Sequence, residues 1–216
     1  MKKQLVIWTA MCCFLFGGVS SLQAQQYFGA SVGGGLSSLS GPDDDDFISF
    51  LFSNRAGFTY QYQLAEVFGL RLESSWSSRG TSYEIQLTDV NGLPLGKRDN
   101  KERLNYVHFH LMGRAELDFF YIASGPYFSI LTGGSRNFPD SFPTDNRGVK
   151  DVYKNTDFGI GTSFGFLIPF SDRGRIELGL QSTMGLIDIF ERNVIGDLDL
   201  RTFEVGLVCG VQVQID

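Results

Sequence analysis

The two histidines of the chain, His108 and His110, are the residues whose type and spacing best suit chemistry. They stand two positions apart, so an extended strand would place both on one face. Imidazoles in such a pair serve as metal ligands, or as a general base beside a serine such as Ser75 or Ser77. The H-E-x-x-H pattern of zinc hydrolases is absent from the sequence, so the spacing alone supports a catalytic interpretation.

A structural role is the alternative, in which both imidazoles lie inside a barrel and hydrogen-bond to Glu73 or Glu116. We favour this interpretation because no metal-binding motif accompanies the histidines. The sequence therefore predicts no catalytic, cofactor-binding or metal-binding residues, no cofactor, and a protein that is not an enzyme.

Two other stretches suggest ligands and are given structural interpretations. The acidic run Asp43–Asp46 offers oxygen ligands for a divalent cation, but the spacing of a calcium loop does not follow it, so we expect a solvated loop. Gly33-Gly34-Gly35 is not followed by the Gly-Lys-Ser/Thr of a phosphate-binding loop.

The first residues have the features of a secretory signal peptide. Lys2 and Lys3 precede an apolar run without charge, Leu5–Val19, and Leu22-Gln23-Ala24 resembles a cleavage site. We expect residues 1–24 to be removed and residues 25–216 to form one domain. The leader holds two lysines and no acid, so its removal takes the formal charge from −6 to −8. An acidic chain of this kind is not expected to bind nucleic acid.

Cys209 is the only cysteine beyond the predicted leader, so no intramolecular disulfide is expected there. It falls in the stretch Phe203–Ile215, where apolar residues alternate with polar or small ones, as in a strand with two different environments. Seven further stretches share this alternation: 27–36, 55–64, 68–79, 104–115, 119–132, 156–168 and 175–187. In 119–132 the outward row is predicted to hold Phe120, Ile122, Pro126, Phe128 and Ile130, with a bulge at Pro126 because proline cannot donate to a ladder.

The connections between these strands alternate between long and short, the asymmetry of bacterial outer-membrane barrels. The sequence predicts an all-β, eight-stranded antiparallel up-and-down transmembrane β-barrel with four long extracellular loops and short periplasmic turns. Part of the second long connection also alternates, at Tyr83, Ile85 and Leu87, so this hairpin is expected to continue as strand beyond the membrane.

Glycine and charge decide which face of the strands points outward. Many glycines share the polar rows with charged residues, and a soluble exterior would not be rich in glycine, which weakens strands. The narrow lumen of an eight-stranded barrel suits small residues and paired charges, which leave no channel. We expect a lumen network of Arg55, Arg71, Glu73, Arg114, Glu116, Asp157, Glu177 and Glu204.

The sequence also resembles the PorT-like outer-membrane β-barrel proteins, whose founding member is associated with a gliding and secretion system. The resemblance rests on four short motifs: Gly69-Leu70-Arg71-Leu72-Glu73, Tyr121-Ile122-Ala123-Ser124-Gly125-Pro126-Tyr127, Asp157-Phe158-Gly159 and Gly185-Leu186-Ile187-Asp188. It implies an eight-stranded barrel in the outer membrane and little about activity, since one fold hosts many functions. The chain differs from many such barrels in finishing with Ile215-Asp216 and not with an aromatic residue.

The expected function is that of a non-enzymatic outer-membrane barrel with a surface interaction, adhesion or envelope-structural role, or an accessory of an export system. The alternative is a lipid-modifying outer-membrane enzyme that uses His108 or His110. The expected partners are outer-membrane lipid or lipopolysaccharide and, through the long loops, other envelope or secretion proteins. We expect a monomer.

Overall fold

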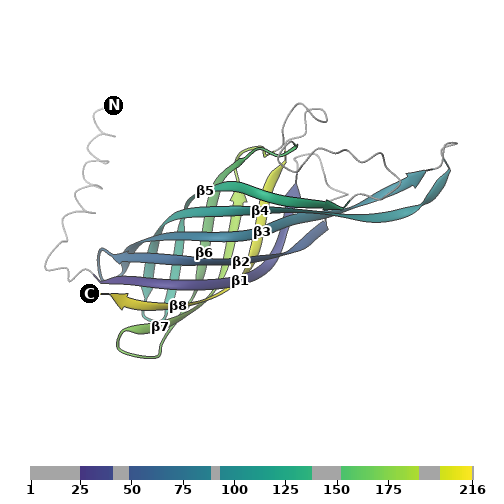
Figure 1. Ribbon diagram of the computed structural model, residues 1–216. Helices are drawn as coiled ribbons and strands as arrows, with labels where there is room; N and C mark the ends of the chain where they lie inside the picture. Colours follow the sequence, from purple (N-terminus) through teal and green to yellow (C-terminus); the bar gives the residue numbers. More distant parts are fainter. Residues whose placement is uncertain (1–24, 41–48, 89–92, 138–151, 190–199, 216) are drawn as a thin grey trace, which may run out of the picture.

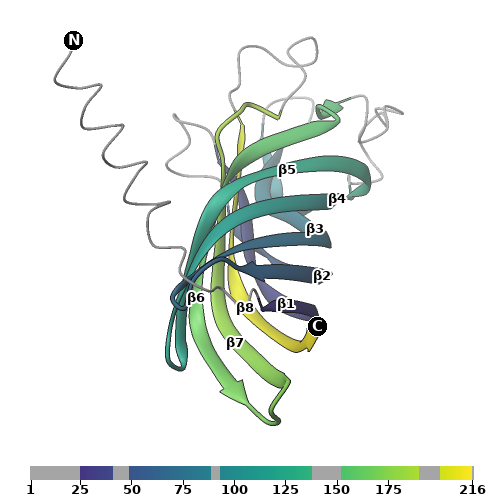
Figure 2. The same cartoon turned by 90° about the vertical axis from the view of Figure 1, so that its left-hand side faces the viewer.

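The computed structural model describes residues 25–40, 49–88, 93–137, 152–189 and 200–215, and the predicted leader and Asp43–Asp46 lie outside them. Eight antiparallel strands form a closed barrel (Figures 1 and 2), as predicted. Their bounds are β1 (Gln26–Ser40), β2 (Ser49–Gln63), β3 (Phe68–Thr88), β4 (Pro94–Leu117), β5 (Phe120–Asn137), β6 (Thr156–Pro169), β7 (Gly174–Gly185) and β8 (Arg201–Ile215). No helix in the described ranges is long and apolar enough to cross a membrane.

The barrel closes by pairing β1 with β8, from Gln26↔Ile215 at one end to Ser40↔Arg201 at the other. Three connections, 64–67, 118–119 and 170–173, are short and lie at the end of the barrel near Gln26, which we call the turn end. The opposite end, where the other connections lie, is the loop end. In the second long connection, most of 81–103 is strand in β3 and β4. This agrees with the alternation at Tyr83, Ile85 and Leu87.

The barrel has an apolar exterior and a polar interior. On β6, for example, Phe158, Ile160 and Phe164 are exposed while Asp157 and Ser163 are buried. A soluble protein buries its large apolar side chains, so this inverted pattern suits a barrel surrounded by lipid.

The outward row predicted for β5 is correct, but the bulge is not. Ile122, Phe128 and Ile130 are exposed, whereas Tyr121 and Tyr127 are each 1% exposed and point inward. The β4–β5 register is the same on both sides of Pro126, at His110↔Tyr127 and Gly113↔Ser124, and the residues between are left out of the ladder. A local gap in the ladder therefore accommodates the missing N–H of Pro126 without a bulge.

Two lumen glycines make room for these tyrosines. A Cβ added to Gly159 would lie 2.7 Å from Cε1 of Tyr127, and one added to Gly179 would overlap the hydroxyl of Tyr121. These glycines of β6 and β7 thus make room in the narrow lumen for large inward side chains of the nearby strand β5.

An apolar cluster covers the lumen at the loop end, and the sequence did not indicate it. Leu39, Leu104, Tyr106 and Leu131 of the barrel wall pack with residues of two connections, Val152, Tyr153, Ile189 and Leu200. We call this set the apolar cap. The hydroxyl of Tyr153 donates to Glu102, and the Lys154 ammonium lies 3.0 Å from the Asp188 carboxylate, so polar contacts hold the same connections in place.

Candidate functional site

The turn-end half of the lumen holds an ion-pair network centred on Glu177. Its carboxylate accepts from Arg71 Nη1 at 2.6 Å and from Arg114 Nη1 at 2.9 Å. Glu116 pairs with Arg114 Nε and with Arg175 Nη1, each at 2.8 Å. The Arg114 guanidinium also lies over the ring of Tyr121, 3.9 Å from its centroid.

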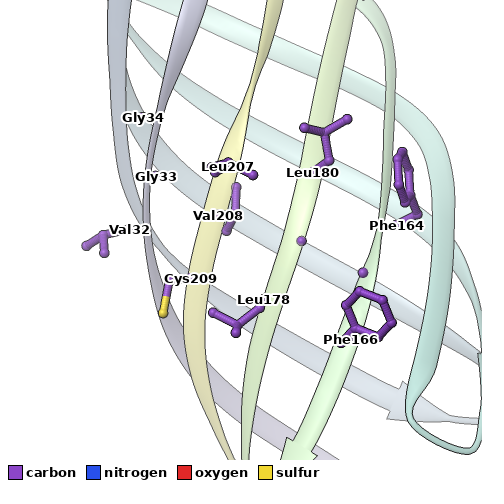
Figure 3. Close-up of a pocket in the computed structure, with 12 residues that line it drawn as sticks. Val32, Gly33, Gly34, Phe164, Phe166, Leu178, Leu180, Leu207, Val208 and Cys209 are labelled. Carbon is purple, nitrogen blue, oxygen red and sulfur yellow. The ribbon is translucent and has the colours of Figure 1, made fainter.

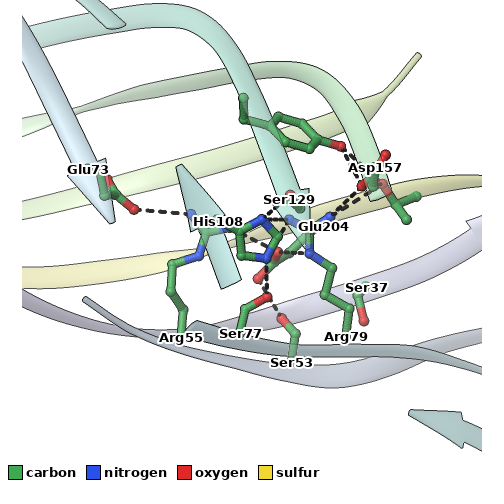
Figure 4. A network of polar contacts seen from close by, with 12 residues as sticks. Ser37, Ser53, Arg55, Glu73, Ser77, Arg79, His108, Ser129, Asp157 and Glu204 are labelled. Atoms are coloured by element: carbon green, nitrogen blue, oxygen red, sulfur yellow. Dashed lines mark hydrogen bonds and ion pairs between the residues drawn. The ribbon is translucent and has the colours of Figure 1, made fainter. Parts of the chain in front are cut away.

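The loop-end half holds a second network (Figure 4) around Arg79 and Glu204. Arg79 Nε lies 3.0 Å from Glu204 Oε2, and Arg79 Nη1 lies 3.3 Å from Asp157 Oδ2. Arg55 Nη2 donates to the same Glu204 at 2.9 Å. Glu73 joins the two networks, because it lies 3.6 Å from Arg55 and 3.5 Å from Arg71.

The eight charged residues predicted to share the lumen all take part in these ion pairs. Sequence reasoning missed Arg79, which was placed at the end of a strand that in fact continues to Thr88, and Arg175, which was placed at the start of β7. The alternation of β3 carried past residue 79 would have put Arg79 in the inward row.

His108 lies inside the loop-end network, but its partners differ from the prediction. Its Nε2 lies 2.6 Å from Ser77 Oγ, its Nδ1 lies 2.5 Å from Ser129 Oγ, and Arg79 Nη2 lies 2.8 Å from Nδ1. The predicted hydrogen bonds to Glu73 or Glu116 do not form. Those carboxylates pair with arginines instead, which are stronger partners than a neutral imidazole.

His110 has no hydrogen-bond partner for either ring nitrogen within the described residues. Its ring stacks on Tyr127, with centroids 5.3 Å apart. The two histidines therefore share the lumen, as predicted, but make different contacts there.

The Ser77–His108 contact has the spacing of a nucleophile and its base. Both residues are 0% exposed, and the second ring nitrogen meets a serine where a catalytic pair would have an orienting carboxylate. Three pockets among the described residues are lined by residues other than Ser77 and His108.

Gly161-Thr162-Ser163-Phe164-Gly165 matches the letters of the G-x-S-x-G motif of serine hydrolases. That motif works on a sharp turn between a strand and a helix, whereas these residues lie in the middle of strand β6. Ser163 is 5% exposed, and its Oγ has no hydrogen-bond partner within the described residues. The sequence therefore matches the motif, but the local structure is not that of a serine hydrolase.

Within the described ranges, no group of three or more His, Cys, Asp or Glu residues could hold a metal ion. A hollow of about 700 Å³ is formed mainly by outward apolar side chains of β1, β6, β7 and β8 (Figure 3). Cys209 contributes to it as one apolar group among others, as its place in the outward row predicted. Acyl chains suit such a surface.

Comparison with solved structures finds similar barrels at low sequence identity. Neisserial surface protein A is 14% identical over 90% of this chain and 100% of that chain, with a TM-score of 0.46. The attachment invasion locus protein Ail of Yersinia pestis is 10% identical over 87% and 99%, with a TM-score of 0.36. OprG of Pseudomonas aeruginosa is 12% identical over 90% and 99%, with a TM-score of 0.37. Likenesses at this level carry no argument about function.

No curated protein matches the sequence. A family model described as an outer membrane protein beta-barrel domain matches residues 19–191, most of the chain. The match agrees with the closed eight-stranded barrel and its apolar exterior. The chain belongs to the outer membrane protein beta-barrel domain family.

Proposed function

We propose that the protein is a non-enzymatic, plugged barrel that holds a contact surface at the outside of the outer membrane. Its role is surface interaction or adhesion, support of the envelope, or assistance to an export system. The resemblance of its motifs to the PorT-like proteins supports the export role. Residues 1–24 would act as a cleaved signal peptide, and the barrel would stand as a monomer among outer-membrane lipid and lipopolysaccharide.

The filled lumen is the observation that carries this proposal. Two ion-pair networks occupy it, Glu73 joins them, and the apolar cap covers the loop end. A barrel of this kind transports nothing through its lumen and exposes no buried catalytic group, so its accessible parts are its lipid face and its two ends. Barrels of this class place their long loops outside the cell, so the apolar cap would face the cell surface.

Conductance tests the plug directly. Purified protein inserted into planar lipid bilayers is expected to show no porin-like current, because charged side chains and the apolar cap block the path. Heat-modifiable gel mobility of the same sample serves as the control that the barrel is folded. Stable single-channel currents of porin size from folded protein would contradict the proposal.

A second function, modification of membrane lipids, is favoured by one observation, the 2.6 Å contact between Ser77 and His108. On our proposal, His108→Ala leaves the lipid composition of the membrane unchanged and lowers the free energy of unfolding by about 1–3 kcal/mol, since Ser77 and Ser129 lose a buried partner. Lipid mass spectrometry and urea titration measure the two effects. Loss of a modified lipid species with His108→Ala, while the barrel keeps its stability, would favour the enzyme.

A further inference from the structure

The hairpin of β3 and β4 extends beyond the barrel wall (Figure 1). Strand β2 pairs with β3 only as far as Ser49↔Ser82, and β5 pairs with β4 only as far as Asn137↔Lys101. Beyond these pairs, residues 83–88 and 94–100 pair with each other and, within the described ranges, with no other strand. We call this part the ribbon. Both its outer edges present backbone N–H and C=O groups.

The two edges of the ribbon differ in how well they resist pairing. The β4 edge carries Pro94, the positive-φ residue Gly96 (φ 131°), two cations at Lys97 and Arg98, and a register shift opposite Thr88. Proline, lysine and bulges are the features by which natural proteins block edge strands. The β3 edge, residues 83–88, reads Tyr-Glu-Ile-Gln-Leu-Thr and has none of them.

Directly opposed residues of β3 and β4 are poorly matched in the ribbon. Glu84 stands directly opposite Asp99, and like charges at such a pair of positions destabilise a sheet. In the alternate row, apolar residues of β3 stand opposite polar or small residues of β4: Tyr83↔Asn100, Ile85↔Arg98 and Leu87↔Gly96. Around Glu84, lysines stand only at the diagonal positions, Lys97 and Lys101. A two-stranded hairpin is only marginally stable in water. A third strand would add directly opposed partners on the other side of β3.

We propose that the β3 edge, residues 83–88, docks an extended segment of a partner protein, which adds to the ribbon as a third strand. The segment carries a lysine or arginine beside Glu84 and apolar residues at the two-residue spacing of Tyr83, Ile85 and Leu87. Main-chain hydrogen bonds then provide affinity, and the cation and apolar residues provide specificity. This deepens the proposed contact role of the loop end and rests on it.

Charge decides against two other occupants of this edge. A second copy of the chain would offer its own Tyr-Glu-Ile-Gln-Leu-Thr edge, which brings no cation to Glu84. Residues 41–48, which precede β2, include four consecutive aspartates and would add acid to the Glu84–Asp99 pair. A basic, alternating segment of another protein is the occupant that fits.

Hydrogen–deuterium exchange on the full-length folded barrel in lipid nanodiscs tests the docking edge. The probe is an eight-residue peptide that alternates Val with Lys, and its matched control alternates Val with Glu. We expect the Val/Lys peptide to slow amide exchange in residues 83–88 by about tenfold at saturation, and to leave β6 unchanged. The Val/Glu peptide and a Val/Lys peptide with N-methylated alternate amides are expected to have no effect, since one carries the wrong charge and the other lacks edge donors.

With Glu84→Lys, we expect the Val/Glu peptide, and no longer the Val/Lys peptide, to slow amide exchange in residues 83–88. Glu66→Lys makes the same change in an exposed turn at the other end of the barrel, and we expect this variant to respond as the wild type does. Three results would overturn the proposal: no slowing by either peptide at millimolar concentration, equal slowing by both, or slow exchange of residues 83–88 before any peptide is added. These results do not bear on whether the lumen conducts ions, so the docking edge can fail while the plugged barrel stands. Conversely, if the barrel conducts ions and residues 83–88 still respond to the Val/Lys peptide, the plug is overturned and the docking edge stands.

Discussion

Arg79→Met is expected to destabilise the folded barrel by about 3–5 kcal/mol, because it removes one partner from a buried set of charges. The Arg79 side chain is 1% exposed and pairs with Glu204 and Asp157, which are buried as well. Methionine has a similar length but no charge and no N–H donor, so the variant removes the ion pairs and the hydrogen bonds to His108 and Thr202 while it keeps most of the packing. Urea titration in lipid vesicles, followed by the fluorescence of Trp76, the only tryptophan beyond residue 24, gives the free energy of unfolding.

Two variants make this result specific. Lys154→Met also removes a cation from an ion pair, but the Lys154 side chain is 36% exposed, so we expect a change within about 1 kcal/mol. Adding Asp157→Asn to Arg79→Met is expected to recover part of the loss, because Asp157 then no longer lies uncompensated, while Glu204 keeps its ion pair with Arg55. If Arg79→Met and Lys154→Met had equal effects, the loop-end network would not be a buried set of charges.

Gly165→Val is expected to prevent closure of the barrel or to destabilise it by at least about 3 kcal/mol, at the upper end for overpacking. A Cβ at this position would overlap the carbonyl oxygen of Leu178 and lie 2.5 Å from the Cα of Gly179. Both are backbone atoms of the neighbouring strand β7, so no change of rotamer relieves the collision. The fraction of protein that shifts on heating in a gel, after refolding into detergent, measures closure.

Gly113→Val is the matched control for this variant. Gly113 is exposed on the outside of the barrel, and a Cβ there would have as its nearest neighbour the Ser124 carbonyl oxygen at 3.9 Å. We expect wild-type refolding, because valine favours strands and faces lipid at this position. Equal damage from both variants would mean that strand propensity, and not lumen space, sets the need for glycine.

The fold was predictable because one signal repeats in eight stretches. Alternation assigns each residue to one of two faces, and the glycines and charges of one row identify the lumen. This was enough for β5, where Tyr121 and Tyr127 point inward and Ile122 and Phe128 point outward. It was also enough for most charged members of the lumen network, although it missed Arg79 and Arg175.

Partners across the lumen could not be predicted in the same way. Alternation tells which face of the sheet a residue lies on, but not its position along the barrel axis. The contacts across the lumen depend on the stagger between strands that are far apart in sequence. This is why His108 was expected beside a carboxylate and instead contacts Ser77 on β3 and Ser129 on β5. The apolar cap was missed for a related reason, since Val152, Tyr153 and Ile189 lie in connections, outside the eight alternating stretches.

The seam between β1 and β8 governs how such a barrel can form. Its ladder joins residues as distant as Gln26 and Ile215, so it requires the largest loop closure in the sheet, and non-local pairings of this kind slow folding. Until the seam closes, an open sheet in lipid leaves two rows of unsatisfied peptide groups, each costing several kcal/mol. Partly formed sheets are therefore poorly populated in the bilayer, and insertion and closure are expected to occur as one cooperative, rate-limiting event.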